Sequence, residues 1–178
     1  MTGQLLVIIV SSGPRTGKST ARAAFARGLR LRGTSTSEVI AGVLEQERGL
    51  PRGTIAAARA LDPALWRAEL REVGDRIGAG PTPAVVRAID IGFRVIDGCR
   101  RASELDAGLR RAEELGLHAV VVWVGGREAD TTQGRADNTE SALLRERATL
   151  EIRNDGSLAD LERAVAAQVA ALQAAGPN

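Results

Sequence analysis

The feature that most restricts the fold of this 178-residue chain is an apolar run followed at once by a small-residue loop and a helix. Leu5–Val10 contains only Leu, Val and Ile, which predicts a buried strand at the centre of a parallel sheet. The loop Ser12–Ser19 has the sequence SGPRTGKS, and a helix is expected from Ser19 to about Leu31, with Gly33 ending it. A strand, a short loop and a helix in this order favour an α/β fold.

The loop has the Walker A pattern of phosphate-binding loops, except that Ser12 stands at the first glycine position. Backbone N–H groups of such a loop and of the following helix bind phosphate oxygens. We expect Gly17 to allow the close turn into the helix, Lys18 to reach the β- and γ-phosphates of ATP, and the Ser19 hydroxyl to ligate Mg²⁺. The alternative is a glycine-containing turn that binds nothing. The predicted nucleotide-binding residues of this segment are Gly13, Pro14, Arg15, Thr16, Gly17, Lys18, Ser19 and Thr20.

Composition supports the phosphate-binding interpretation. Lys18 is the only lysine beside 23 arginines, and a planar guanidinium cannot easily replace a compact ammonium surrounded by backbone. The same excess weakens every argument from a single arginine. A net charge of +2 makes no case for general DNA binding, and two Phe and two Trp are too few for stacking single-stranded bases.

Two further features bear on location and cofactor chemistry. The single cysteine, Cys99, excludes an internal disulfide framework and a cysteine-based zinc site. Leu5–Val10 is too short for a signal-peptide core or a membrane span. We therefore expect a cytoplasmic protein without membrane association.

The remaining pattern alternates strands and helices. Thr34–Ser37 is either a short extended piece or a helix N-cap, and Gly125–Asp137 is a polar, glycine-containing loop. Further strands are expected at Phe93–Asp97, Ala119–Val124 and Thr149–Arg153. The predicted fold class is α/β, with three layers and a parallel sheet of four to five strands. Further helices are expected at about residues 38–48, 54–60, 62–77, 84–91, 103–115, 138–147 and 157–175.

Two carboxylates lie where a nucleotide site is expected. Asp97 ends a strand, and ligands of doubly wound sheets bind at the carboxyl ends of the strands. Asp97 is therefore predicted to hold Mg²⁺ through water or to contact the acceptor, with capping of the next helix as the alternative. Glu38 either contacts the acceptor or acts as a general base, or it only stabilises a helix N-terminus.

Several arginines and one turn are weaker candidates. Arg100 or Arg101 is predicted to bind an acceptor phosphate or the transferred phosphoryl group, because Arg forms bidentate phosphate contacts. Arg67 and Arg71 belong to the expected acceptor side, and Arg127 and Arg135 suit a lid that brings positive charge to the transition state. Each is otherwise a solvated surface residue. The turn formed by Asn154, Asp155 and Gly156 either packs on the adenine or only precedes a helix.

Four segments together carry a family resemblance: the Ser12–Ser19 loop, Arg94–Leu105 (RVIDGCRRASEL), Asp137–Glu140 (DNTE) and Ile152–Leu158 (IRNDGSL). The chain resembles the phage-type deoxynucleoside monophosphate kinases, within the nucleoside monophosphate kinase-like P-loop proteins. The resemblance implies a core formed by residues 1–33 and 92–178, a helical acceptor-binding insert at about 34–91, and a short lid at about 125–140. It also implies that Lys18 and Ser19 serve ATP and Mg²⁺ and that Asp97 and Arg100 or Arg101 belong to the active-site rim, while Arg127 would act from the lid.

The acceptor predicted first is a deoxynucleoside monophosphate. Its phosphate oxygen is already anionic and needs no base, whereas an alcohol acceptor benefits from a carboxylate. Phage relatives also phosphorylate a hydroxymethyl group in DNA, such as that of 5-hydroxymethyluracil, for which Glu38 or Asp97 would be the base and DNA the partner. A nucleotide-binding protein without turnover is the other alternative. A homodimer is compatible with the sequence, and the location would be the bacterial host cytoplasm if the chain is phage-encoded.

Overall fold

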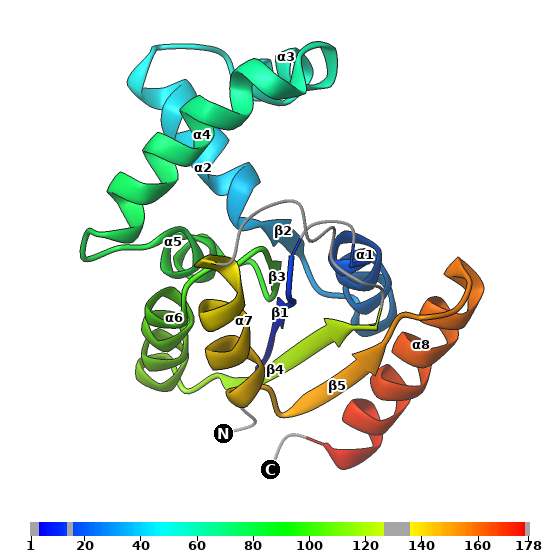
Figure 1. Ribbon diagram of the computed structural model, residues 1–178. Helices are drawn as coiled ribbons and strands as arrows, with labels where there is room; N and C mark the ends of the chain where they lie inside the picture. Colours follow the sequence, from blue (N-terminus) through cyan, green and yellow to red (C-terminus); the bar gives the residue numbers. More distant parts are fainter. Residues whose placement is uncertain (1–3, 14–15, 127–135, 177–178) are drawn as a thin grey trace.

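The computed structural model describes residues 4–13, 16–126 and 136–176, without the side chains of 63–65, 67 and 136–139. Five parallel strands form one sheet in the order β2-β3-β1-β4-β5 (Figure 1). Two of the four consecutive strand pairs, β2 with β3 and β4 with β5, are neighbours in the sheet, and helices connect these parallel strands. The strands are β1 (Leu5–Val10), β2 (Gly33–Ser35), β3 (Val95–Asp97), β4 (His118–Gly125) and β5 (Leu150–Arg153).

Helices cover both faces of the sheet. On one face α1 (Lys18–Leu29) packs against α8 (Leu158–Ala175). On the other lie α5 (Ala84–Asp90), α6 (Ala102–Glu114) and α7 (Ala136–Glu146) (Figure 1). The predicted three-layer α/β class with a parallel sheet is therefore confirmed.

The central strand explains why its sequence is uniformly apolar. Leu6, Ile8 and Val10 enter the core beneath α5, α6 and α7, whereas Val7 and Ile9 enter the core beneath α1 and α8. All five side chains are fully buried. A strand with both faces covered has no solvated side, so it carries no alternation of polar residues.

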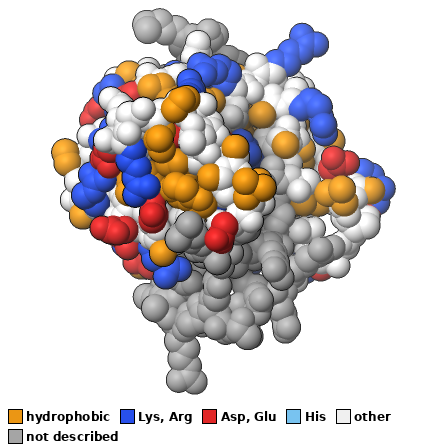
Figure 2. Space-filling view, turned by 90° about the horizontal axis from the view of Figure 1, so that it is seen from above, with side chains coloured by type: hydrophobic (Ala, Val, Ile, Leu, Met, Phe, Trp, Pro, Cys, Tyr) orange, Lys and Arg blue, Asp and Glu red, His pale blue; other side chains and the backbone are white. Residues whose placement is uncertain are grey.

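Three helices form a second packing unit beyond the β2 end of the sheet (Figure 1). They are α2 (Thr36–Glu47), α3 (Thr54–Leu61) and α4 (Pro63–Gly78), and we call them the helical unit. When the molecule is viewed from above, hydrophobic side chains gather in one area, with basic side chains scattered around it (Figure 2). The unit has a core of its own, formed by Ala41, Leu44, Ile55, Leu70, Val73 and Ile77.

The segment predicted as the helical insert, about residues 34–91, begins with a short strand and ends with a helix that packs on the sheet. Gly33–Ser35 is a strand that pairs with β3, and Ser35 is also the N-cap of α2, so both alternatives for this segment hold. Helix α5 packs in the core of the sheet through Val85 and Ile89. A three-residue polar strand has no apolar pattern to reveal it, and the packing partner of α5 is decided by tertiary contacts.

The end of α1 also differs from the prediction. The helix ends at Leu29, and Arg30 adopts a left-handed conformation with φ 56°. The Leu31 N–H donates to the Ala26 carbonyl at 3.0 Å, which closes a Schellman-type end without the usual glycine. Gly33 is not the stop signal but the first residue of β2.

Candidate active site

The phosphate loop joins β1 to α1 as predicted. Gly17 is the residue whose backbone conformation the loop restricts most. Gly17 has φ +92°, and a Cβ at this position would lie 2.5 Å from Asn154 Nδ2 and 2.9 Å from Leu161 Cδ2. Gly17 is also the N-cap of α1, where it has no side chain to bond the first N–H groups. The first turn of α1 contains no acidic residue, so its N–H groups and dipole favour an anion.

Lys18 lies inside this loop. Its Nζ donates to the Gly13 carbonyl and, at 2.5 Å, to Ser11 Oγ. Burial lowers the pKa of Lys18 from 10.5 to about 8; the charge of Asp97 opposes this shift and that of Arg100 adds to it. An ammonium with so little hydration gains strongly from an anionic ligand.

Two residues far from the loop in sequence, Asn154 and Ser141, donate hydrogen bonds to its backbone carbonyls. Asn154 Nδ2 donates to the Thr16 carbonyl at 2.9 Å, and Ser141 Oγ on α7 donates to the Ser12 carbonyl at 3.1 Å. Asn154 is only 5% exposed, so its side chain positions the loop and has little surface for stacking on an adenine. The predicted Gly156 lies before α8, where a Cβ would approach Asp160 Oδ2 to 2.6 Å.

Asp97 faces the start of α1 from the neighbouring strand. The parallel register pairs it with Ile9, and Ser19 Oγ donates to Asp97 Oδ2 at 3.2 Å. Asp97 is 2% exposed, and burial raises its pKa against the opposing effects of Arg22, Ser19 and Lys18. It does not cap α6, because the Ala102 N–H donates to Glu140 Oε2 at 2.8 Å.

The Ser19–Asp97 pair fits Mg²⁺. A hydroxyl and a carboxylate are hard oxygen ligands, and Mg²⁺ is usually held by one or two carboxylates together with water and phosphates. Among the described residues, no three His, Cys, Asp or Glu side chains gather to hold a metal by themselves. A protein-only metal cage is therefore not the arrangement seen in this part of the chain.

Glu38 is occupied by local structure. It forms a capping box with Ser35: the Glu38 N–H donates to Ser35 Oγ at 3.1 Å, and the Ser35 N–H donates to Glu38 Oε2 at 3.0 Å. Thr34 Oγ1 donates to the same carboxylate oxygen at 2.8 Å. The helix-stabilising role is thus present in the structure, and the predicted contact with an acceptor stays a prediction.

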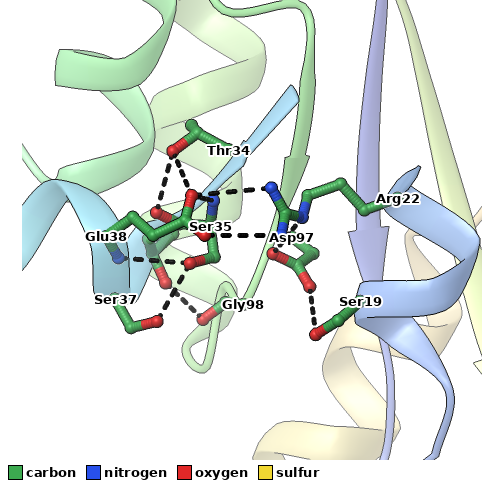
Figure 3. Close-up of polar contacts among 9 residues, drawn as sticks. Ser19, Arg22, Thr34, Ser35, Ser37, Glu38, Asp97 and Gly98 are labelled. Atoms are coloured by element: carbon green, nitrogen blue, oxygen red, sulfur yellow. Dashed lines mark hydrogen bonds and ion pairs between the residues drawn. The ribbon is translucent and has the colours of Figure 1, made fainter. Parts of the chain in front are cut away.

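Arg22 contacts both carboxylates, although no motif in the sequence pointed to it. Its Nε lies 3.4 Å from Asp97 Oδ1, and its Nη2 lies 3.4 Å from Glu38 Oε1 (Figure 3). The available signal was its position one helical turn after Lys18, which places it on the same side of α1. Among so many arginines, that spacing did not single it out.

The other predicted arginines are dispersed. Arg100 is exposed, and its guanidinium has no hydrogen bond or ion pair with a described residue, yet its charge lowers the pKa of Lys18. Arg101 Nη2 is paired with Asp75 Oδ1 of α4 at 2.6 Å, and Arg71 is exposed on α4. Thr20 is half-buried in the first turn of α1. The described residues do not include Pro14, Arg15, Arg127, Arg135 or the side chain of Arg67. Most of the predicted lid also lies outside the described residues.

A cavity of about 420 Å³ adjoins the loop at the ends of β4 and β5. Trp123 contributes an aromatic wall, and Arg145 lies over this ring at 5.7 Å from its centroid. Polar groups of the loop before α8 border the same space. Its lining includes Ser12, Trp123, Gly126, Arg145, Arg153 and Asp155.

Comparison with solved structures identifies the fold. A shikimate kinase from Acinetobacter baumannii, in complex with shikimate, superposes with a TM-score of 0.50 at 15% identity, covering 94% of each chain. The chain has a P-loop kinase fold. The shikimate kinase of Aquifex aeolicus vf5 gives a TM-score of 0.47 at 13% identity, covering 94% of this chain and 99% of that one.

Sequence comparison does not assign a family. No family model matches the chain, and no curated protein matches it. The resemblance to phage-type deoxynucleoside monophosphate kinases therefore stays a prediction. No helix in the described ranges has both the length and the apolar character needed to cross a membrane.

Proposed function

We propose that this protein is an ATP- and Mg²⁺-dependent phosphotransferase. The observation that carries the proposal is the placement of Ser19 and Asp97, 3.2 Å apart, at the start of the helix that follows the Lys18 loop. ATP bound with Mg²⁺ would supply the phosphoryl group and part of the charge neutralisation. Positioning and charge stabilisation are the main contributions that a protein makes to this reaction.

Each residue has a role that follows from its position. Gly17 and the N-terminal N–H groups of α1 would bind phosphate oxygens, and the poorly hydrated Lys18 ammonium would attract the terminal phosphates. Ser19 and Asp97 would hold Mg²⁺. Arg100, whose guanidinium has no partner among the described residues, would stabilise negative charge on the acceptor side.

For the acceptor, we propose a nucleoside monophosphate, most simply a deoxynucleoside monophosphate. The support is the state of Glu38, whose carboxylate oxygens are taken up by Thr34, the Ser35 N–H and Arg22. An alcohol acceptor gains from a free base, whereas a phosphate acceptor does not require one.

The cavity beside the loop is the site we propose for the nucleoside part of ATP. It adjoins Ser12 at the start of the phosphate loop and has both an aromatic wall and polar groups. Binding sites for small molecules commonly combine these two features. At the turn after β5, Arg153 and Asp155 would therefore contact the base of ATP, in place of the predicted contact from Asn154.

A phosphoryl-transfer panel tests the proposal. The purified protein is incubated with [γ-³²P]ATP and Mg²⁺, and with deoxynucleoside monophosphates, ribonucleoside monophosphates, shikimate or DNA containing 5-hydroxymethyluracil. Transfer to a monophosphate is the expected result, with Lys18→Ala as the inactive control. Transfer to DNA or shikimate alone would refute the acceptor but keep the phosphotransferase, and no transfer to any acceptor would refute both.

A further inference from the structure

Arg22 lies at the junction of three elements that the proposed reaction needs. It belongs to α1, one turn after Lys18 and Ser19, and it faces Asp97 at the end of β3 and Glu38 in the first turn of α2 (Figure 3). Its side chain is 20% exposed, and that of Asp97 is 3% exposed. The Arg22–Asp97 side of the junction is therefore largely shielded from water, whereas the Glu38 side chain is 51% exposed.

The two oxygens of Asp97 have different partners. Oδ2 accepts the hydrogen bond from Ser19, whereas Oδ1 faces Arg22 Nε at 3.4 Å. Arg22 Nε and Asp97 Oδ1 are both buried and have no hydrogen-bond partner among the described groups. Arg22 Nε and Asp97 Oδ1 therefore face each other as opposite charges, and the guanidinium in this position leaves Oδ2 to accept from Ser19.

Glu38 holds the other side of the guanidinium. Its two oxygens lie 3.4 Å and 3.5 Å from the Nη atoms of Arg22, while the capping box keeps the same carboxylate at the N-terminus of α2. The aliphatic stem of Arg22 passes over Gly33, where a Cβ would lie 3.5 Å from Arg22 Cγ. Both the head and the stem of the side chain are therefore restrained.

We propose that Arg22 is a positioning residue that orients Asp97 toward Ser19 and connects this pair to the helical unit through Glu38. The inference rests on the proposed phosphotransferase function. A planar guanidinium presents its donors in a fixed fork, so one arginine can contact two carboxylates in a way that a lysine cannot. The connected side chains are Ser19, Asp97, Arg22 and Glu38, and they link the start of α1 to the start of α2.

This arrangement predicts a specific defect when Arg22 is changed. Without its guanidinium, Asp97 is free to rotate away from Ser19, whereas Gly17 and Lys18 keep their own contacts. Small displacements of positioning groups cost up to about 100-fold in rate. The variant should therefore lose turnover and Mg²⁺ dependence while keeping Mg²⁺-free nucleotide binding.

The test compares Arg22→Gln with Arg27→Gln, a control on the same helix whose arginine side chain is 73% exposed. For Arg22→Gln we expect kcat to fall about 10- to 100-fold, with KM for ATP within about threefold of the wild type. By calorimetry, Mg²⁺ should strengthen ADP binding to the wild type and to Arg27→Gln, and this gain should disappear in Arg22→Gln. An Arg22→Gln variant that keeps both kcat within twofold and the full Mg²⁺ effect would overturn the proposal.

Two additions separate a positioning role from a loss of folding and from a failure of the proposed function. Arg22→Lys keeps the positive charge but not the fork, so it should show the same loss of the Mg²⁺ effect with the thermal midpoint of the wild type. If Arg22→Lys kept the Mg²⁺ effect, the claim that the planar guanidinium is needed to orient Asp97 would be refuted. Wild-type protein that binds no nucleotide would refute the proposed function itself, and the role of Arg22 with it.

The connection to the helical unit is tested by a double-mutant cycle with Glu38→Gln. Glutamine keeps an oxygen for the Ser35 N–H and removes the charge that faces Arg22. We expect the effects on kcat to be non-additive, so that Arg22→Gln/Glu38→Gln is no slower than Arg22→Gln alone. If the two substitutions lowered kcat by independent factors that multiply, the connection through Glu38 would be refuted. The role of Arg22 would then be limited to orienting Asp97.

Discussion

The phosphate-loop edge of the sheet and the helical unit are stabilised in different ways. At the loop, polar groups bond to partners far away in the chain: Asn154 Nδ2 donates to the Thr16 carbonyl, and Ser19 Oγ donates to Asp97 Oδ2. In the helical unit a small apolar core is surrounded by largely exposed ion pairs, among them Arg76 with Glu47 at 2.7 Å. Exposed pairs of this kind contribute little to stability.

The difference teaches where substitutions should be tolerated. A loop that points buried N–H groups and a buried ammonium at one location allows few changes in backbone or side chain. A unit of amphipathic helices depends mainly on apolar residues that face its core. The helical unit should therefore tolerate more substitutions than the loop.

The largest expected effect comes from Lys18→Ala. Removing one charge-stabilising donor of an active site typically costs about 100- to 1,000-fold in rate, and we expect a loss of at least this size in phosphoryl transfer. The fold should persist, because burial lowers the pKa of Lys18 and its charged form therefore opposes folding at neutral pH. Activity is measured with labelled ATP, and stability by thermal unfolding. Full activity of the variant would exclude the proposed mechanism.

Gly17→Ala should have the next largest effect. The added Cβ requires a left-handed alanine and meets Asn154 Nδ2 at 2.5 Å. We expect the free energy of unfolding to fall by roughly 1–3 kcal/mol and nucleotide affinity to fall with it. Urea unfolding and calorimetric titration with ADP check this. Unchanged affinity would show that the backbone of the loop is less restricted than its geometry indicates.

Nucleotide affinity should also depend on pH through Lys18. In the free protein its pKa is about 8, and phosphates raise it in the complex, so binding takes up a proton above pH 8. Affinity for ADP should therefore fall by up to about tenfold between pH 7 and pH 9. The effect on folding has the opposite sign: the unfolded chain binds more protons between the two pKa values, so this group favours folding as pH rises from 8 to 10.5. Lys18→Met should abolish the dependence of affinity.

The smallest effect is expected in the helical unit. Gly42 lies within α2, and a Cβ there would meet nothing within 4 Å. Gly42→Ala should raise the free energy of unfolding by about 0.5–1 kcal/mol, because alanine loses less backbone entropy on folding. The measurement is urea unfolding beside Gly17→Ala. A destabilised Gly42→Ala would contradict the open surroundings of this helix.

Much of the fold could be predicted from local patterns. Leu5–Val10 lacked any polar alternation, which indicated a strand covered on both faces, and the structure places it at the centre of five parallel strands. The short strand Gly33–Ser35 could not be distinguished from a helix N-cap, because a glycine and two small polar residues have no apolar periodicity. Nor could the packing of α5 on the sheet be deduced, since its apolar residues suit either core.

For the site, the local part was predictable and the long-range part was not. The order of Gly17, Lys18 and Ser19 specifies a phosphate loop because backbone geometry and charge at adjacent positions are sufficient for it. The sequence by itself therefore determined the parallel α/β class and the loop. Tertiary structure alone decided that Asn154 lies beneath the loop and that Arg22 joins Asp97 to Glu38. Those contacts depend on how strands and helices distant in the chain are brought together, and spacing along the sequence does not encode that directly.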